Sequence, residues 1–266
     1  MTVSNRSESI SGPPQLTVEQ GKATICFNRS SQHNRIEPAD LDTLIDLFEQ
    51  IDRNPDCRVL ILTGSGKSFS SGYHIGALTG PERSGQQPRD PDAFQTMVDT
   101  LESLKIPTIA ALNGGIYGGA TDLALACDFR IGVVGMQMFM PAARLGIVYY
   151  ESGLRRYVSR LGLDNAKKLF LTAAPVKAEE MLAMGFVSEL TAPDQLMSRA
   201  HALADQITGN APLALMALKR ALNDIAAGQF DAVRHLCDRD RCMSSQDHQE
   251  GLAAWRDRRK PIFRGQ

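Results

Sequence analysis

Two short apolar runs, RVLILTG at residues 58–64 and PTIAALN at 107–113, constrain the fold more than any other feature of this 266-residue chain. Each run is about one strand long and lacks alternation of polar and apolar residues, which is typical of strands covered on both faces in a parallel sheet. The segment 37–54 carries apolar residues at helical spacing, and a second helical segment spans 92–104. Because strands that alternate with helices build layered folds, the sequence predicts an α/β protein.

The other segments divide the chain into two regions. Residues 15–28 predict two strands around a glycine turn, and residues 128–133 predict a further strand. Beyond residue 151 the pattern becomes helical, with helices expected at 152–161, 165–171, 178–184, 198–208, 213–227 and 246–259. We therefore predict a core over 1–195 and a C-terminal helical region over 196–266.

Composition and charge narrow the class of protein. The chain is 43% hydrophobic and 22% charged, as in ordinary soluble globular proteins, and its net charge of −1 argues against nucleic acid or an anionic membrane as the main partner. The polar start lacks the apolar core of a signal peptide, and the apolar run 109–127 is interrupted by Asn113 and Asp122, so a buried element fits it better than a membrane span. The five cysteines are odd in number and form no CxxC pair, which indicates reduced thiols rather than a disulfide or zinc framework. We predict a cytoplasmic protein without a bound metal ion.

The stretch NGGIYGGATDLALAC, residues 113–127, places four glycines in its first seven positions, directly before an apolar helix. Backbone N–H groups at a helix start have no intrahelical acceptor, the helix dipole adds partial positive charge there, and glycine lets a ligand approach closely. A second glycine turn, SSGYHIG at 70–76, follows the strand at 58–64. The two turns could bind one substrate oxygen between them, and Asp122, three residues beyond Gly119, could exchange a proton beside that oxygen.

These residues also have purely structural explanations. Gly118 and Gly119 would allow a helix to pack tightly on a strand, and Asp122 would balance the dipole in the first turn of its helix. Glycine turns are common in proteins. From the residues alone, both explanations stay open.

Taken together, the segments 58–78 and 106–132 are similar to the paired signature of the crotonase family, the enoyl-CoA hydratase/isomerase superfamily. The resemblance continues through LFLTAAPVKAEEMLAMGFVSEL at 169–190 and the ending EGLAAWRDRRKPIFRGQ at 250–266. It implies a spiral of ββα turns followed by a C-terminal helical trimerisation region. Homotrimers, often paired as hexamers, are the assembly that the resemblance implies.

The resemblance also implies an activity. Family members are lyases or isomerases of fatty acid metabolism that act on acyl-coenzyme A thioesters and bind no cofactor tightly. Two backbone amides, which correspond to those of Tyr73 and Gly119, polarise the thioester carbonyl and stabilise its enolate in an oxyanion hole. The adenine half of coenzyme A is expected near the first motif, and residues 260–263 are expected to help bind it, across a subunit contact. The coenzyme A contacts implied in this way are Gly72, Tyr73, His74, Ile75, Gly118, Lys260 and Phe263.

The chain departs from the family's catalytic pattern in three places. His74 replaces an aspartate, and a lone histidine is more often structural than catalytic. Asp122 stands where hydratases carry their first catalytic glutamate and is one methylene shorter. Ala142 stands at the position of the second glutamate, so the usual pair of carboxylates that holds a water molecule is incomplete.

Two nearby residues, Tyr149 and Glu151, could compensate. Tyr149 falls where the related methylmalonyl-CoA decarboxylases have a tyrosine, although those enzymes have a histidine in place of Tyr73. Glu151 lies at an expected helix start, where an acid is stabilised in any case, and a tyrosine pair at a strand end is ordinary amphipathic core. The candidate catalytic residues are Tyr73, Gly119, Asp122, Tyr149 and Glu151.

Three functions remain in competition. A hydratase or isomerase would use Asp122 as its only carboxylate. An acyl-CoA decarboxylase of the methylmalonyl-CoA type would form the enolate by loss of carbon dioxide and need no strong base, with Tyr149 and His74 orienting the carboxylate. A non-catalytic acyl-CoA-binding or RNA-associated scaffold is disfavoured by the retained glycines and by the nearly neutral charge. The sequence favours the first and does not specify the acyl chain.

Overall fold

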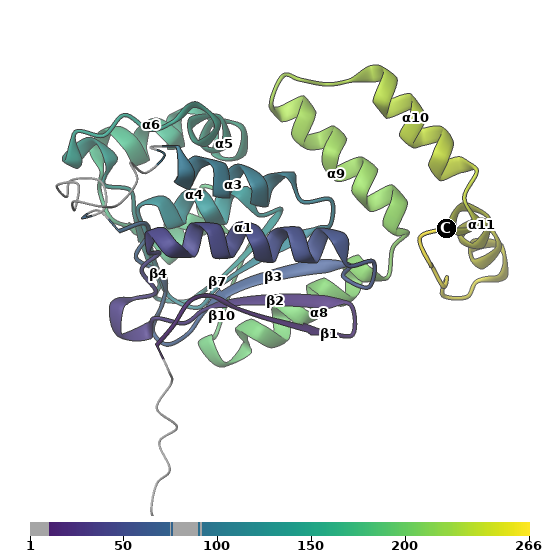
Figure 1. Cartoon of the computed structure of the whole chain (residues 1–266), viewed down its shortest axis with the longest axis horizontal. Helices are drawn as coiled ribbons and strands as arrows, with labels where there is room; N and C mark the ends of the chain where they lie inside the picture. Colours follow the sequence, from purple (N-terminus) through teal and green to yellow (C-terminus); the bar gives the residue numbers. More distant parts are fainter. Residues whose placement is uncertain (1–10, 75, 77–89, 91) are drawn as a thin grey trace, which may run out of the picture.

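The computed structural model describes residues 11–74, 76, 90 and 92–266, and Figure 1 shows their arrangement. Ile75 and most of the loop 79–91 lie outside the described residues. The described chain forms two β-sheets, helices that cover them, and a group of C-terminal helices that stands to one side.

In the larger sheet, the strands follow the spatial order β1 (Gln15–Glu19), β2 (Lys22–Phe27), β3 (Val59–Gly64), β5 (Thr108–Leu112), β7 (Phe129–Val133) and β10 (Glu189–Thr191). β1 and β2 form the predicted antiparallel hairpin, which turns at Gln20 and Gly21 with positive φ at both residues. From β2 to β10 all neighbours are parallel. The two apolar runs that predict buried strands become the neighbouring strands β3 and β5, which confirms the α/β prediction.

A smaller sheet contains, in spatial order, β4 (Ser68–Ser70), β6 (Gly115–Tyr117), β8 (Gln137–Phe139) and β9 (Val176–Lys177). The first three strands are parallel to one another. The sequence predicts none of these four strands, because two or three residues are too few to show a strand pattern. In particular, β6 separates Asn113 from the helix, so the expectation that this stretch passes directly from a glycine turn into a helix is wrong by one short strand.

Three successive strand pairs repeat the same path. β3–β4, β5–β6 and β7–β8 each place their first strand in the larger sheet and their second in the smaller one. α3 (Ala93–Ser103), α4 (Gly119–Ala126) and α5 (Glu151–Leu161) follow these pairs in turn. This repetition confirms the spiral of ββα turns that the resemblance implies, and it brings the ends of β4 and β6 together.

Helices cover both faces of the larger sheet. Figure 1 shows α1 (Pro38–Arg53) and α3 on one face and α8 (Leu196–Thr208) on the other. α8 contacts β3, β5 and β7, and it buries Ala200, Ala204 and Ile207. The region 196–266 therefore begins with a helix that is part of the hydrophobic core. The predicted helices α6 (Leu163–Thr172) and α7 (Ala178–Ala183) lie between α5 and α8 in the chain.

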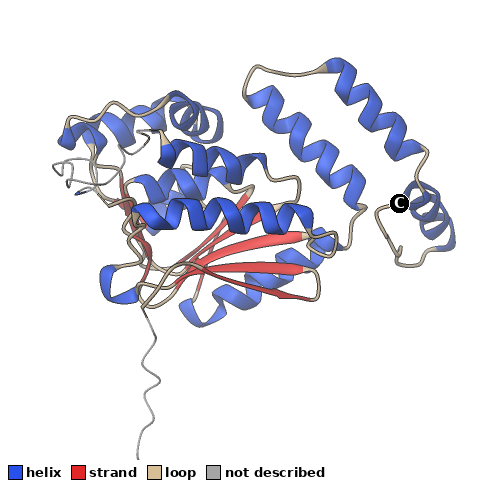
Figure 2. Cartoon of the chain, viewed as in Figure 1, coloured by secondary structure: helices blue, strands red, loops and turns tan. Residues whose placement is uncertain are grey.

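The remaining C-terminal residues, 212–266, form an arm beside the core, and its regular structure is entirely helical (Figures 1 and 2). It comprises α9 (Pro212–Ala226), α10 (Ala232–Met243), α11 (Gln246–Asp257) and a short tail. α10 was not predicted, because the charged residues in AVRHLCDRDRCM obscure an apolar stripe. Within this one chain no residue of α9 or α10 is buried. The exposed large apolar side chains of the arm are Leu218, Leu222, Ile225, Phe230, Val233, Leu236, Met243, Leu252, Trp255 and Ile262.

None of the helices in the described part of the chain combines the length and the hydrophobicity that crossing a membrane requires.

The turn between β5 and β6 generates a prediction about stability. A Cβ atom at Gly114 would overlap the backbone carbonyl oxygen of Lys67, which cannot rotate away as a side chain could. We expect Gly114→Ala to lower the free energy of unfolding by about 1–3 kcal/mol or more, measured by chemical denaturation. Gly251→Ala is the matched control, because its Cβ would meet only the Phe263 ring at 3.6 Å and helix α11 would gain propensity. Equal stability of the two variants would contradict the close approach of Gly114 to the backbone of Lys67.

Candidate active site

The two glycine turns meet at the ends of β4 and β6. A Cβ atom at Gly72, whose φ is +85°, would lie 2.5 Å from the Tyr117 carbonyl oxygen and 3.1 Å from the Gly119 nitrogen. Glycine is therefore required at position 72 for both its conformation and its contacts. The turn is held by two backbone bonds, in which the Ile36 N–H donates to the Gly72 carbonyl and the His74 N–H donates to the Ile36 carbonyl, each at 3.0 Å. The predicted pairing of the two turns is thus present in the fold.

Gly119 is the first residue of α4. The Gly118 N–H donates to the Phe139 carbonyl at 2.8 Å, whereas the Gly119 N–H has no acceptor among the described residues. Such an amide, at the positive end of the helix dipole, suits an oxygen that carries negative charge. A Cβ atom at Gly119 would lie 2.5 Å from Cζ of Phe94, and the Phe94 ring in turn contacts the Tyr73 ring at a centroid distance of 5.4 Å. An aromatic side chain thus borders both turns.

Asp122 has no exposed surface, and the buried residue Arg156 binds both of its oxygens. The guanidinium donates from Nε to Oδ1 at 2.8 Å and from Nη2 to Oδ2 at 2.9 Å. The hydroxyl group of Tyr150 also donates to Oδ2. The structure therefore places Asp122 in the first turn of α4, within an ion pair that the sequence patterns do not predict.

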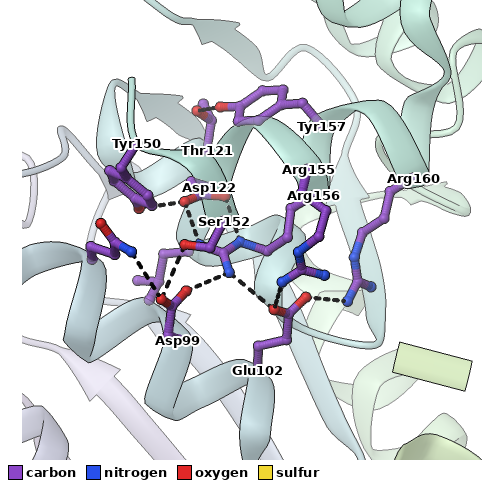
Figure 3. Close-up of polar contacts among 12 residues, drawn as sticks. Asp99, Glu102, Thr121, Asp122, Tyr150, Ser152, Arg155, Arg156, Tyr157 and Arg160 are labelled. Atoms are coloured by element: carbon purple, nitrogen blue, oxygen red, sulfur yellow. Dashed lines mark hydrogen bonds and ion pairs between the residues drawn. The ribbon is translucent and has the colours of Figure 1, made fainter. Parts of the chain in front are cut away.

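Figure 3 shows that Arg156 lies at the centre of a larger charged cluster between α3 and α5. Its Nη1 donates to Asp99 at 2.7 Å and to Glu102 at 3.0 Å, and Arg155 and Arg160 also bind Glu102. Burial by itself would raise the pKa of Glu102, but the charge of Arg156 and the hydrogen bond from Arg155 outweigh it, so this pKa is lowered. Burial opposes the charge of Arg156, yet its bonds to Asp122 and the charge of Glu102 raise its pKa.

The sequence did carry a signal for Arg156. The buried residues of α5 are Gly153, Arg156, Tyr157 and Leu161, which form one stripe at helical spacing. An arginine within an apolar stripe indicates a buried partner of opposite charge. The partner Asp122 lies 34 residues earlier in the chain, so only the fold brings the two together.

The neighbouring residues Tyr149 and Tyr150 make different contacts. The rings of Tyr149 and Tyr150 stack at a centroid distance of 4.4 Å, and Tyr149 also packs against Tyr157 and Phe170. Only Tyr150 is bonded to Asp122, whereas the Tyr149 hydroxyl donates weakly to that of Tyr150 at 3.4 Å. Burial and the charge of Asp122 raise the pKa of both phenols. Tyr149 thus fits the aromatic core, and Tyr150, which is not among the predicted site residues, contacts the candidate acid.

The structure also locates the other candidates near the turns. Glu151 is exposed at the first position of α5, which agrees with a helix-start acid. His74 is directed to α1, with Nδ1 2.8 Å from Oε2 of Glu37. Ala142 is buried. In the described part of the chain, none of these three residues is hydrogen-bonded to Asp122 or Tyr150.

Lys260 and Phe263 lie in the tail of the arm, and Figure 1 shows the C-terminus on the opposite side of the molecule from β4. Two carboxylates of α11 hold this tail. Asp247 accepts bonds from two backbone N–H groups of the tail at 2.7 Å, and Glu250 accepts from the Ile262 N–H at 2.8 Å. Within one chain, the tail and the two turns are not brought together.

Comparison with known proteins places this geometry in a family. The family model described as enoyl-CoA hydratase/isomerase matches residues 17–266. A putative enoyl-CoA hydratase/isomerase, YngF, of Bacillus subtilis is 31% identical and aligns over 91% of this chain and 94% of its own. A crotonyl-CoA hydratase of Syntrophomonas wolfei is 30% identical over 93% of this chain and 96% of its own. The crystal structure of an enoyl-CoA hydratase from Bacillus anthracis superposes with a TM-score of 0.84 at 29% identity, covering 96% of this chain and 100% of that one.

The buried ion pair generates a prediction about stability. Arg156→Met leaves Asp122 buried without its counter-charge, so we expect the free energy of unfolding to fall by about 3–5 kcal/mol in a denaturation experiment. Adding Asp122→Leu should recover part of this loss, because no unpaired charge then remains. The control Arg53→Met breaks an exposed pair with Glu49 and should cost less than about 1 kcal/mol. An Arg156→Met protein as stable as the control would contradict the role given to this pair.

Proposed function

Because this chain belongs to the enoyl-CoA hydratase/isomerase family, we propose that it binds an acyl-coenzyme A thioester and stabilises the enolate of that thioester. The observation that carries the proposal is the contact of the Gly72 turn with the Gly119 amide at the start of α4. We assign the two donors to the backbone N–H groups of Tyr73 and Gly119. In an oxyanion hole each donor is worth about 3–4 kcal/mol, because it is in place before the charge develops.

The most strongly supported reaction is hydration or isomerisation of a CoA-linked enoyl group. Two relatives carry the names crotonyl-CoA hydratase and short-chain-enoyl-CoA hydratase, each 30% identical to this chain over more than nine-tenths of its length. Asp122 is the proposed acid–base group on account of its position beyond Gly119. To exchange a proton with substrate it would have to give up a bond, because its oxygens bind Arg156 and Tyr150 and no atom is exposed.

Decarboxylation is the second candidate. The methyl group of Ala142 and the pairing of Asp122 with Arg156 favour a reaction that needs no strong base. Loss of carbon dioxide from a malonyl-type thioester would leave the enolate directly, and the same two amides would stabilise it. Tyr149 and His74 were the expected carboxylate ligands, but His74 is bonded to Glu37. Release of carbon dioxide from methylmalonyl-CoA at a rate above crotonyl-CoA hydration would identify this alternative.

We further propose a cytoplasmic homotrimer or homohexamer that holds no cofactor tightly. The apolar side chains exposed on the arm support association, because a chain rarely leaves so many large apolar groups in water. In such an assembly, Lys260 and Phe263 of one subunit would contact the coenzyme A bound at the turns of a neighbour. The position of the tail, far from the turns of its own chain, supports this arrangement.

The oxyanion assignment predicts a specific difference between two variants. Gly119→Pro removes the amide hydrogen at a position where proline suits a helix start, and Gly119→Ala adds the same Cβ near Phe94 but keeps the hydrogen. We expect the turnover of crotonyl-CoA by the proline variant to lie about 100-fold or more below that of the alanine variant. Circular dichroism and melting would verify that both are folded. Equal turnover by two folded variants would refute the assignment.

The proposed assembly can be tested on the arm. Leu222→Asp with Trp255→Asp places charges on two exposed apolar positions, which are 64% and 87% exposed in the single chain. We expect light scattering to show a trimer or hexamer for the wild type and smaller species for this variant, because a buried unpaired charge opposes association. Val18→Asp, on strand β1 and outside the arm, should leave the assembly intact. A monomeric wild type would contradict the proposal.

A further inference from the structure

The direction of one hydrogen bond determines what Tyr150 can offer to a bound molecule. A carboxylate can only accept hydrogen bonds, so the phenolic hydrogen of Tyr150 points at Asp122. Burial and the charge of Asp122 raise the pKa of Tyr150, which keeps it a phenol at neutral pH. The lone pairs of its oxygen then point away from Asp122. One of them accepts a long hydrogen bond from the Tyr149 hydroxyl at 3.4 Å, which leaves the oxygen able to accept a further one. Tyr150 therefore presents a hydrogen-bond acceptor.

Tyr150 is also the member of this group that a ligand could reach. Asp122 and Arg156 are fully buried, whereas Tyr150 is partly exposed at the residue before α5. Its ring contacts Phe94 edge-on at a centroid distance of 6.4 Å. Phe94 also contacts Tyr73 and borders Gly119, so this one ring connects Tyr150 with both glycine turns.

The Tyr150 hydroxyl is held in place by the ion pair of Asp122 and Arg156. Arg156 binds both oxygens of Asp122 and is itself held by Asp99 and Glu102, so the carboxylate cannot rotate without breaking several bonds. Hydrogen bonds in a chain polarise one another. Because Tyr150 donates to the negatively charged Asp122, its phenol oxygen gains negative partial charge and becomes a better acceptor. Arg156 also donates to Asp122 and holds the carboxylate in its orientation.

We propose that the Tyr150 oxygen accepts a hydrogen bond from the hydroxyl group of a 3-hydroxyacyl thioester, or from the water molecule that takes its place in the enoyl complex. Asp122 and Arg156 position this acceptor, and the hydrogen bond forms without loss of a proton from Tyr150. The proton exchange of hydration remains with Asp122, as proposed above. The proposal rests on the hydratase-type function proposed above. It supplies an acceptor for water at a site where position 142 offers only a methyl group.

Binding measurements separate the proposal from a structural role. The probes are 3-hydroxybutyryl-CoA and butyryl-CoA, which differ by the hydroxyl group, and calorimetry measures the affinity of each. We expect wild type to prefer the hydroxylated thioester, and we expect Tyr150→Phe to lose about 2- to 12-fold of affinity for it, the range for one hydrogen bond, with butyryl-CoA affected less than about twofold. Hydration of crotonyl-CoA should fall at least about tenfold in kcat, with a smaller change in KM.

The matched control is Tyr157→Phe. It removes a phenol from the same aromatic cluster, but this phenol is bonded to Thr121 instead of Asp122. We expect its preference between the two thioesters to equal that of the wild type. A Tyr150→Phe protein that binds and hydrates like wild type, or that loses affinity for both thioesters equally, would overturn the proposal. A larger selective loss in Tyr149→Phe would overturn it as well.

Asp122→Asn tests the positioning role. If Asp122 acts through Tyr150, this variant should lose the hydroxyl preference, and the double variant with Tyr150→Phe should be no worse than either single variant. A variant that loses turnover but keeps the preference would show that Asp122 exchanges the proton without positioning Tyr150, which would overturn the positioning role. A wild type without hydratase activity would refute the proposed function, whereas the two binding affinities would still decide whether Tyr150 recognises the hydroxyl group.

Discussion

The ion pair between Arg156 and Asp122 determines how the helices of the site lie against one another. Its guanidinium comes from α5, reaches α4 through Asp122, and reaches α3 through Asp99 and Glu102. Removing charged groups from water is costly, and the cost is offset only when donors and acceptors are matched. Here three arginines face three carboxylates, so the cluster is balanced in charge. The helix that carries Gly119 is thereby held in one orientation relative to α5.

In this arrangement, orienting a neighbouring group and contacting the substrate would fall to different side chains, whereas the resemblance implies that hydratases of the family use a pair of glutamates. A carboxylate bound at both oxygens by a buried arginine is well suited to orient a neighbour and poorly placed to approach a substrate. A phenol is longer than a carboxylate and can extend the same interaction toward the ligand. The proposed site would combine the backbone amides of Tyr73 and Gly119 with side chains particular to this chain, so the fold alone does not specify the reaction.

Sequence patterns predicted the parts of the molecule that depend on local physics. The buried strands and helix α1 follow from apolar periodicity. Glycine at two strand ends allows the contact between the Gly72 turn and Gly119 but does not require it. The short strand β6 was missed because three residues show no period. Arg156 was missed because its partner is remote in sequence, although its place in the apolar stripe of α5 was visible. Tyr149 was chosen over Tyr150 because a motif position does not show which of two stacked rings meets the acid.

The arm has a consequence for substrate binding in oligomers that contain both intact and defective subunits. The tail that carries Lys260 and Phe263 is bound to α11 through Asp247 and Glu250, so its position is set by the arm. A tail that serves a neighbour makes substrate affinity a property of the oligomer. Dilution below the dissociation constant of the assembly would then weaken substrate binding without altering any residue of the site. In the proposed oligomer, a defect in the tail of one subunit would therefore reduce the activity of a neighbour whose own sequence is intact.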